Sequence, residues 1–358
     1  MKQFTPCFTN LDSYIENKRE PDFNNLLRVL KREKPLRPTL FEFFLNDGLY
    51  KSFSYKIKYD ESDALVPFKM MIDAFKIAGY DYVTMLGSDF GFKNKRHQEE
   101  GQASISLNEG AVIFDRDSFE SYDWPDPDRY DYSRLEKLSE YLPKGMKIIV
   151  YGPNGVLETV IALVGYENLC YLTIDEPLLV QDIFNAVGSR FTRYYEICSG
   201  FESVGALISN DDWGFNTQTF LSTEDMRKYV VPWHGRIVDI IHAAGKPSIL
   251  HSCGKLDLMM EDIISKIKFD AKHSYEDNII PVEEAYEMWG NRIAILGGID
   301  VDFICRSTPE KVYSRSVAML ERASGKGGYA LGSGNSIPYY VPCDNYLAMI
   351  AAAKWNSE

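Results

Sequence analysis

Two residues with metal-binding side chains, His251 and Cys253, lie two positions apart at the end of an apolar run that begins at Pro247. If the run is a β-strand, both side chains point to one face, and one metal ion can accept the imidazole nitrogen and the thiolate. Cys343, far along the chain, is predicted to supply a third ligand from a loop. One nitrogen and two sulfurs select zinc over magnesium or calcium and leave a position for substrate. The alternative is an ordinary histidine beside a buried cysteine, because this spacing is short and common.

Carboxylates follow two other apolar runs. Asp211 and Asp212 come as a pair after residues 206–210, and Glu276 follows residues 269–274. We expect one of the two aspartates to face the metal and to orient a ligand or the substrate, and the other to cap a helix or meet solvent. Glu276 is predicted to be either a fourth zinc ligand that the substrate displaces or a solvated loop carboxylate. These three residues are the candidate catalytic residues.

Eight apolar runs rich in β-branched and aromatic residues recur along the chain, each followed by a turn and a segment with helical spacing. The predicted strands are 39–44, 82–86, 147–152, 206–210, 247–251, 269–274, 292–297 and 328–332. This alternation favours a (β/α)8 barrel of the α/β class, and the absence of Gly-x-Gly-x-x-Gly weakens the alternative of a doubly wound sheet. The polar residues after the strands then meet on one rim, where the active sites of such barrels lie.

Two regions depart from this repeat. Residues 1–36 precede the first strand and include an amphipathic stretch, 23–34, which predicts a helix over the amino-terminal end of a barrel formed by residues 37–358. Residues 90–145 form an insertion after the second strand, in which segments 103–107 and 111–115 are predicted to pair as a β-hairpin. Such insertions commonly shape the mouth of a substrate site. Within the barrel, Ser222 and Gly245 predict the start and the end of a helix over 223–244.

The composition limits the partners and the compartment. The chain has 358 residues, of which 45% are hydrophobic and 25% charged, and it carries a formal net charge of -13. These values are typical of soluble globular proteins, and since no basic stripe is present we expect no nucleic-acid partner. No run of about 18 apolar residues predicts a membrane span, and the amino terminus does not have the pattern of a signal peptide. Six scattered cysteines fit a reducing compartment, which predicts a cytoplasmic protein.

The carboxyl-terminal part of the sequence carries several distinctive motifs. They are Ser209-Asn-Asp-Asp-Trp-Gly, Pro247-Ser-Ile-Leu-His-Ser-Cys-Gly-Lys, Ile295-Leu-Gly-Gly-Ile-Asp, Gly328-Tyr-Ala-Leu-Gly-Ser-Gly-Asn and Val341-Pro-Cys-Asp-Asn-Tyr. With them the chain resembles the uroporphyrinogen decarboxylase superfamily, and within it the branch of methylcobamide methyltransferases typified by the enzyme that methylates coenzyme M. The resemblance implies a (β/α)8 barrel with a zinc ion held by His251, Cys253 and Cys343. The decarboxylase branch begins with a Pro-x-Trp-x-Met-Arg-Gln-Ala-Gly-Arg pattern, which residues 37–46 lack.

The resemblance also implies a reaction. Zinc favours the ionised form of a substrate thiol, and the thiolate would take a methyl group from a methylated corrinoid. The chain has no Asp-x-His-x-x-Gly corrinoid motif, so a partner corrinoid protein would supply methylcobalamin. Gly332, Gly334 and Asn335 would lie against this cofactor, unless the glycines only form a turn. Coenzyme M, homocysteine, another thiol or tetrahydrofolate could be the acceptor. A tetrapyrrole decarboxylase and a non-catalytic binding partner of a corrinoid protein are the alternatives.

Overall fold

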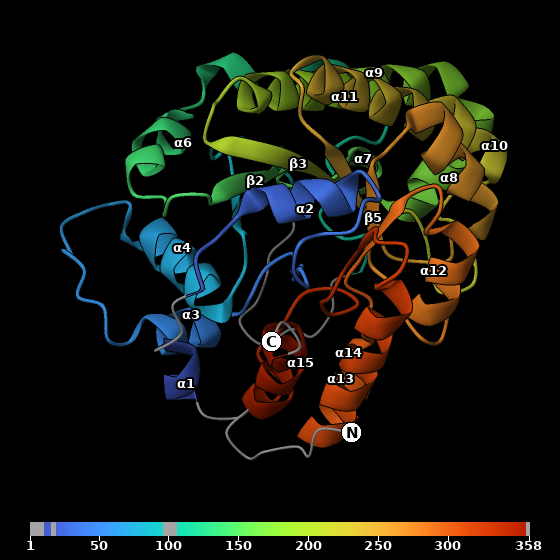
Figure 1. Ribbon diagram of the computed structural model, residues 1–358. Coiled ribbons are helices and arrows are strands. Elements are labelled where there is room, and N and C mark those ends of the chain that lie inside the picture. Colours follow the sequence, from blue (N-terminus) through green and yellow to red (C-terminus); the bar gives the residue numbers. More distant parts are fainter. Residues whose placement is uncertain (1–10, 16–18, 96–105, 356–358) are drawn as a thin grey trace.

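The computed structural model describes residues 11–15, 19–95 and 106–355, which fold as an α/β barrel (Figure 1). Seven strands form one sheet in which each strand is parallel to its neighbour and the strands follow chain order. They are β1 Tyr82–Leu86, β2 Lys147–Tyr151, β3 Val204–Asn210, β4 Ser248–His251, β5 Ala271–His273, β6 Ala294–Leu296 and β7 Tyr329–Ala330. Helices connect the parallel strands and cover the outside of the curled sheet, so the predicted barrel architecture is confirmed.

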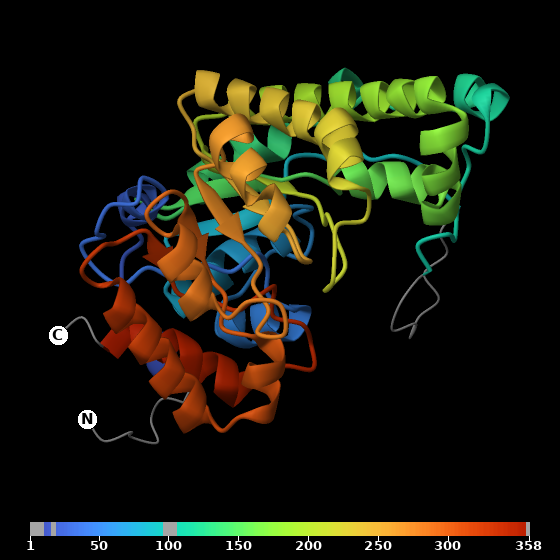
Figure 2. The ribbon, with the colours of Figure 1, turned by 90° about the vertical axis from the view of Figure 1, so that its right-hand side faces the viewer.

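The helices of the described part differ widely in length. They are α1 Leu11–Ile15, α2 Phe23–Leu30, α3 Asp47–Ser54, α4 Val66–Ala78, α5 Arg116–Ser121, α6 Ser133–Lys137, α7 Val156–Val164, α8 Tyr166–Asp175, α9 Pro177–Ser199, α10 Thr223–Asp225, α11 Val231–Ala243, α12 Val282–Trp289, α13 Val301–Arg306, α14 Pro309–Ala323 and α15 Cys343–Trp355. The predicted helix over 223–244 is confirmed, because α10, a π-helical turn and α11 follow one another, and Ser222 accepts the first N–H bond. The end of the long α9 projects with α8 beyond the barrel (Figure 2).

No single helix among the described residues is long and apolar enough to cross a membrane. Only α7 and α8 together, which meet at an angle of 94°, have the required length and composition.

The predicted strand over 39–44 closes the barrel without forming a ladder. On one side, Leu40 and Leu45 make isolated parallel bridges to Leu331 and Ile337. On the other side, the hydroxyl groups of Tyr82 and Thr84 in β1 donate to backbone carbonyls of residues 42 and 43. Side chains therefore take the place of backbone pairing between this segment and β1, which is why seven strands form the sheet although eight runs have the strand pattern.

The amphipathic stretch near the amino terminus forms α2, whose buried face includes Phe23, Leu26 and Val29. The N–H of Phe23 donates to Gly145 O just before β2, and Gly328 N, just before β7, donates to Glu33 O. The helix thus lies across the amino-terminal ends of the strands, as its pattern predicted, and leaves the opposite rim open.

The insertion over 90–145 is helical in its described part, and the predicted hairpin is wrong for its second arm. Residues 103–105 lie outside the described residues, and 107–110 form turns. The 111–115 segment is not a strand, because the N–H groups of Val112 and Ile113 both donate to Leu163 O at the end of α7. The last carbonyls of a helix have no partner within the helix. One of them accepts the N–H groups of this segment, which a second strand would otherwise have bound.

Gly332, predicted either to lie against a corrinoid or only to form a turn, packs closely against the closing segment, residues 39–44. A Cβ atom built on it would lie 1.6 Å from the backbone oxygen of Phe41, in the closing segment. Its own carbonyl accepts the N–H of Ile299. The glycine is therefore needed where the closing segment packs against the chain after β7, and its contact with a corrinoid stays a prediction.

We expect Gly332→Ala to lower the free energy of unfolding by about 3 kcal/mol, because the added methyl group must displace backbone, which cannot rotate away. Gly235→Ala is the matched control, since a Cβ atom there meets nothing within 4 Å. This control should be neutral or slightly stabilising, because alanine is the better helix former. Urea denaturation of both variants measures the difference, and equal stabilities would show that the barrel wall can yield at position 332.

Candidate metal centre

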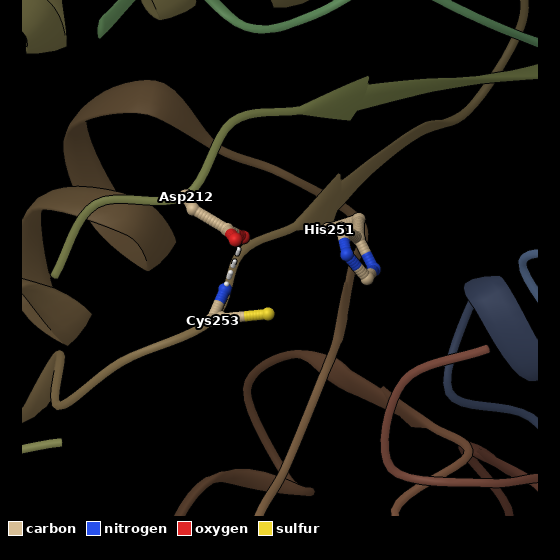
Figure 3. A group of neighbouring side chains, drawn as sticks. All are labelled: Asp212, His251 and Cys253. Atoms are coloured by element: carbon tan, nitrogen blue, oxygen red, sulfur yellow. Dashed lines mark hydrogen bonds between the residues drawn. The ribbon is translucent and has the colours of Figure 1, made fainter. Parts of the chain in front are cut away.

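Three side chains that can bind a metal ion meet at the carboxyl ends of β3 and β4. His251 is the last residue of β4, Cys253 follows two positions later, and Asp212 lies two residues beyond the end of β3. The register pairs Asn210 with His251, which brings the residues after both strands together. One ligand atom of each of the three residues lies within 4.8 Å of the others (Figure 3). This Asp212–His251–Cys253 group is the candidate metal centre.

The loops around Cys253 hold its sulfur between two hydrogen-bond donors. Ser274 Oγ donates to Cys253 Sγ over 3.2 Å, and Asn335 Nδ2 donates over 3.3 Å. Ser274 has a φ of 82°, a strained backbone for a residue with a side chain, and such strain is found mainly at functional sites. The backbone N–H of Cys253 donates to Asp212 Oδ1 over 2.8 Å, which fixes the carboxylate beside the thiol.

Burial raises the pKa of the Cys253 thiol, and the negative charge of Asp212 raises it further. A cation bound between these groups would reverse both effects, because it stabilises thiolate and carboxylate alike. The residues present fit zinc, since zinc accepts nitrogen, sulfur and oxygen ligands, and three protein ligands leave one position for a substrate. The donors that point at the sulfur suit a thiolate ligand as well.

His251 is buried, and burial lowers its pKa to about 4, so the imidazole is neutral and its lone pair is available to a metal. Its Nδ1 lies 2.8 Å from Nδ1 of His273, whose Nε2 lies 3.3 Å from the carbonyl of Ser333. If His273 donates to that carbonyl, His251 must donate to His273, and Nε2 of His251 remains as the ligand atom. His273 thus orients His251. The sequence could have indicated it, because both histidines lie at the ends of neighbouring predicted strands.

Cys343, predicted as the third ligand, does not join this group. It lies at the first position of α15, and the residue as a whole is exposed. Partial burial of its sulfur raises the pKa of the thiol. After β7 the chain crosses the rim, where Gly334 O accepts the N–H of Tyr275 and Ile337 N donates to Phe44 O, and it then reaches α15 at Cys343. Among the described residues, the third member of the compact group is Asp212, so the group as it stands has one sulfur. Cys343 as a ligand stays a prediction that depends on the path of this loop.

The two neighbouring aspartates have different surroundings. Asp211 is fully buried, and its oxygens accept the N–H groups of Leu157 and Glu158 at the start of α7. Trp213 Nε1 and His234 Nε2 lie 3.1 Å and 2.8 Å from its Oδ2. Asp211 therefore caps a helix that has no side-chain cap of its own, and the neighbouring Asp212 faces the metal centre.

We expect Asp211→Ala to cost about 2–3 kcal/mol of stability, because it leaves two helix N–H groups and a buried imidazole without their acceptor. Zinc content per folded chain should stay as in the parent, which metal analysis after gel filtration measures alongside urea denaturation. Asp239→Ala, in the middle of α11, provides a control for loss of one aspartate. A variant that keeps its stability but loses zinc would place Asp211 in the metal centre.

Glu158 is a further carboxyl group at the centre that the sequence did not single out. It lies in the first turn of α7, where an acidic residue is expected for reasons of helix stability alone. Burial raises the pKa of Glu158 well above its usual value, and the charges of Asp212 and Asp211 raise it further. Its proximity to Asp212 depends on the capping of α7 by Asp211, which no local pattern shows.

A cleft of about 790 Å³ adjoins the metal centre at the carboxyl ends of β5 to β7. Glu276, half-buried, lines it, as do Gly334 and Asn335. Glu276 lies outside the three-residue group, and its pKa is raised first by burial and then by the charges of Asp300 and Asp212. Asn335 contacts both the cleft and the sulfur of Cys253, so it connects the two.

The chain is an α/β barrel protein with an imidazole, a thiol and a carboxylate grouped at the carboxyl ends of its strands, where they could hold a metal ion. Residues 110–355 match the model of the uroporphyrinogen decarboxylase (URO-D) family, and the chain belongs to this family. The resemblance drawn from the sequence motifs is confirmed at this level. No curated protein matches the chain.

Two solved structures are similar to the chain over most of its length. One is a methyltransferase from Methanosarcina mazei, with 16% identity, a TM-score of 0.65, and coverage of 92% of this chain and 97% of the other. The second is a putative vitamin-B12-independent methionine synthase from Listeria monocytogenes, with 13% identity, a TM-score of 0.52, and coverage of 94% and 98%. At these identities the similarity establishes the fold.

Proposed function

We propose that this protein is a zinc-dependent methyltransferase that moves a methyl group between a methylated corrinoid, carried by a partner protein, and a small thiol. The observation that supports this most is the Asp212–His251–Cys253 group in a chain of the URO-D family. Its nitrogen, sulfur and oxygen atoms suit zinc, and its place on the active rim of the barrel suits catalysis.

A zinc ion bound there would favour the thiolate form of the substrate at neutral pH. Asp212, His251 and Cys253 would hold the ion. Ser274 and Asn335 keep the cysteine sulfur in place by donating to it. With a methylated corrinoid as the second substrate, a bond would form between the thiol sulfur and the methyl carbon as the carbon–cobalt bond breaks. The electron pair would stay on the corrinoid, and the thiol proton would pass to solvent.

The alternative of a tetrapyrrole decarboxylase requires arginines near the first strand. Arg37 stands in this part of the chain, but it donates to the buried Asp81 and to Glu20 O, on the amino-terminal side of the closing segment. It is thus engaged away from the metal centre. This arrangement favours methyl transfer over decarboxylation.

The test combines metal analysis with a turnover assay. We expect about one zinc per chain in protein purified without chelators, and thiol-dependent loss of the methylcobalamin absorbance. Absence of zinc, or turnover of uroporphyrinogen by the same preparation, would contradict the proposal. Binding of a corrinoid protein without any turnover would support the non-catalytic alternative instead.

A further inference from the structure

The cleft beside the metal centre is acidic and contains aromatic side chains. Its lining includes four carboxylates, Glu276, Asp277, Asp300 and Asp302, and one cation, Arg306. Tyr275, Phe303 and Tyr340 also line it. Carboxylates beside aromatic rings are the surroundings that stabilise an organic cation.

Two of the four carboxylates are already paired. Asp302 accepts from Arg306 over 2.6 Å, and Asp277 accepts from Arg315, which also binds Glu283. Within the described ranges, neither Glu276 nor Asp300 has a cation within 4.0 Å, and Asp300 accepts only backbone N–H groups. The cleft therefore has uncompensated negative charge, and its one lining cation is engaged.

The buried Lys272 does not supply the missing positive charge to the cleft. Its ammonium group donates to the carbonyls of Ser252 and Ser274 and lies 4.3 Å from the centre of the Tyr275 ring. It thus holds together the two loops that carry Cys253 and Glu276. The pKa of Glu276 stays raised in spite of Lys272, mainly through burial and then through Asp300 and Asp212.

A second feature indicates that a ligand completes the site. Tyr275 is 3% exposed and lines the cleft, yet its hydroxyl group has no hydrogen-bond partner among the described residues. A buried hydroxyl without a partner is costly, so a ligand with a polar group at this depth would be stabilised. Asn335 lines the same cleft and donates to Cys253 Sγ, which places the cleft directly beside the metal centre.

We propose that the methyl acceptor is an aminothiol, whose sulfur binds at the Asp212–His251–Cys253 group while its ammonium group lies in the acidic cleft near Glu276 and Asp300. This inference rests on the proposed methyl transfer and adds the charge of the acceptor. A sulfonate thiol such as coenzyme M would have to place its anion among carboxylates with no free cation to meet it, and it is disfavoured.

The experiment compares thiols of equal chain length whose second functional group is positive, neutral or negative. The zinc-loaded full chain is given methylcobalamin with 2-aminoethanethiol, 2-mercaptoethanol or 2-mercaptoethanesulfonate. The three-carbon analogue of each thiol is tested as well, so that the result does not depend on a single chain length. We expect kcat/KM for the ammonium thiols to exceed that for the sulfonates at least tenfold, with the neutral thiols between them. Binding of the same thiols to the cobalt(II)-substituted protein, followed by visible absorption, should give the same order without turnover.

Two variants test whether the cleft causes the preference. The intrinsic reactivity of each thiol is the same with variant and parent, so it cancels when their preferences are compared. Glu276→Gln should reduce the preference for ammonium over sulfonate about tenfold, whatever its effect on the absolute rates. Asp302→Asn, on the exposed rim and outside the metal centre, should reduce it as well by freeing Arg306, and it serves if Glu276→Gln lowers zinc content.

The outcomes distinguish this inference from the proposed function. If methyl transfer occurs and sulfonates serve as well as ammonium thiols, or if both variants keep the parent's preference, the aminothiol inference is overturned and methyl transfer stands. If ammonium thiols bind selectively but no thiol is methylated, the charge assignment of the cleft is supported and the proposed function is wrong. If no thiol binds, both are overturned.

Discussion

Cys253→Ser is expected to lower zinc affinity by more than about 100-fold and to abolish thiol-dependent methyl transfer, while the chain stays folded. The change removes the one sulfur of the Asp212–His251–Cys253 group, and loss of a group that only supports a metal ligand already costs about 10- to 100-fold. Serine keeps the size of the side chain, so the barrel should not be disturbed. Zinc titration against a chelator of known affinity gives the change, and circular dichroism gives the folding control.

Cys343→Ser is the matched control, because it makes the same chemical change at an exposed position on α15. It should keep the zinc affinity and the turnover of the parent. Loss of zinc in Cys343→Ser as well as in Cys253→Ser would restore the ligand set of His251, Cys253 and Cys343 that the sequence motifs imply. Asp212→Asn extends the test, because an amide is a weaker ligand than a carboxylate. Its zinc affinity should lie between that of Cys253→Ser and that of Cys343→Ser.

The sequence allowed the barrel to be predicted because each parallel strand is a short apolar run followed by a helix, and such local patterns determine the class of fold. Seven of the eight predicted runs join the sheet. The eighth run, 39–44, fits the pattern equally well, but two of its backbone carbonyls accept hydrogen bonds from side-chain hydroxyl groups of β1. A sequence pattern that favours an extended chain does not show whether its backbone N–H and C=O groups will bond to a neighbouring strand or to side chains.

The site was predictable where spacing alone fixes geometry. His251 and Cys253 end one strand and must be neighbours, whereas Cys343 could reach them only if a long loop folded inward. In the structure, the backbone of this loop binds Tyr275 and Phe44 instead. Asp211 and Asp212 could be recognised as a pair with divided roles, but only the packing of α7 against β3 shows which one faces the metal centre.

Glu42 gives the chain a pH-dependent stability that its position in the closing segment explains. It is fully buried, and Ser333 donates to it through both its N–H, over 2.6 Å, and its hydroxyl, over 2.7 Å. Burial raises the pKa of Glu42 from 4.5 to about 8, and these two hydrogen bonds lower it only in part. The folded chain therefore holds a proton that the unfolded chain has lost between these two values.

The sign follows from linkage. A raised folded-state pKa contributes stability that is fully present below pH 4.5 and is lost as the pH rises through about 8. At about 1.4 kcal/mol per pH unit, the full effect is about 5 kcal/mol. We expect Glu42→Gln to remove this loss, because the amide keeps the shape, can still bind Ser333, and has no proton to release. The free energy of unfolding of the variant minus that of the parent should thus increase from pH 5 to pH 8.5.

Urea denaturation of parent and variant across this range measures the difference, in which all other titrating groups, the metal centre included, cancel to first order. Glu158→Gln is a useful comparison, since Glu158 also has a raised pKa but lies beside Asp212 and not in the closing segment. Two parallel curves for Glu42→Gln and parent would mean that Glu42 is ionised in the folded chain throughout. In that case the barrel closure at Ser333 would depend on a buried carboxylate, and the raised pKa would be wrong.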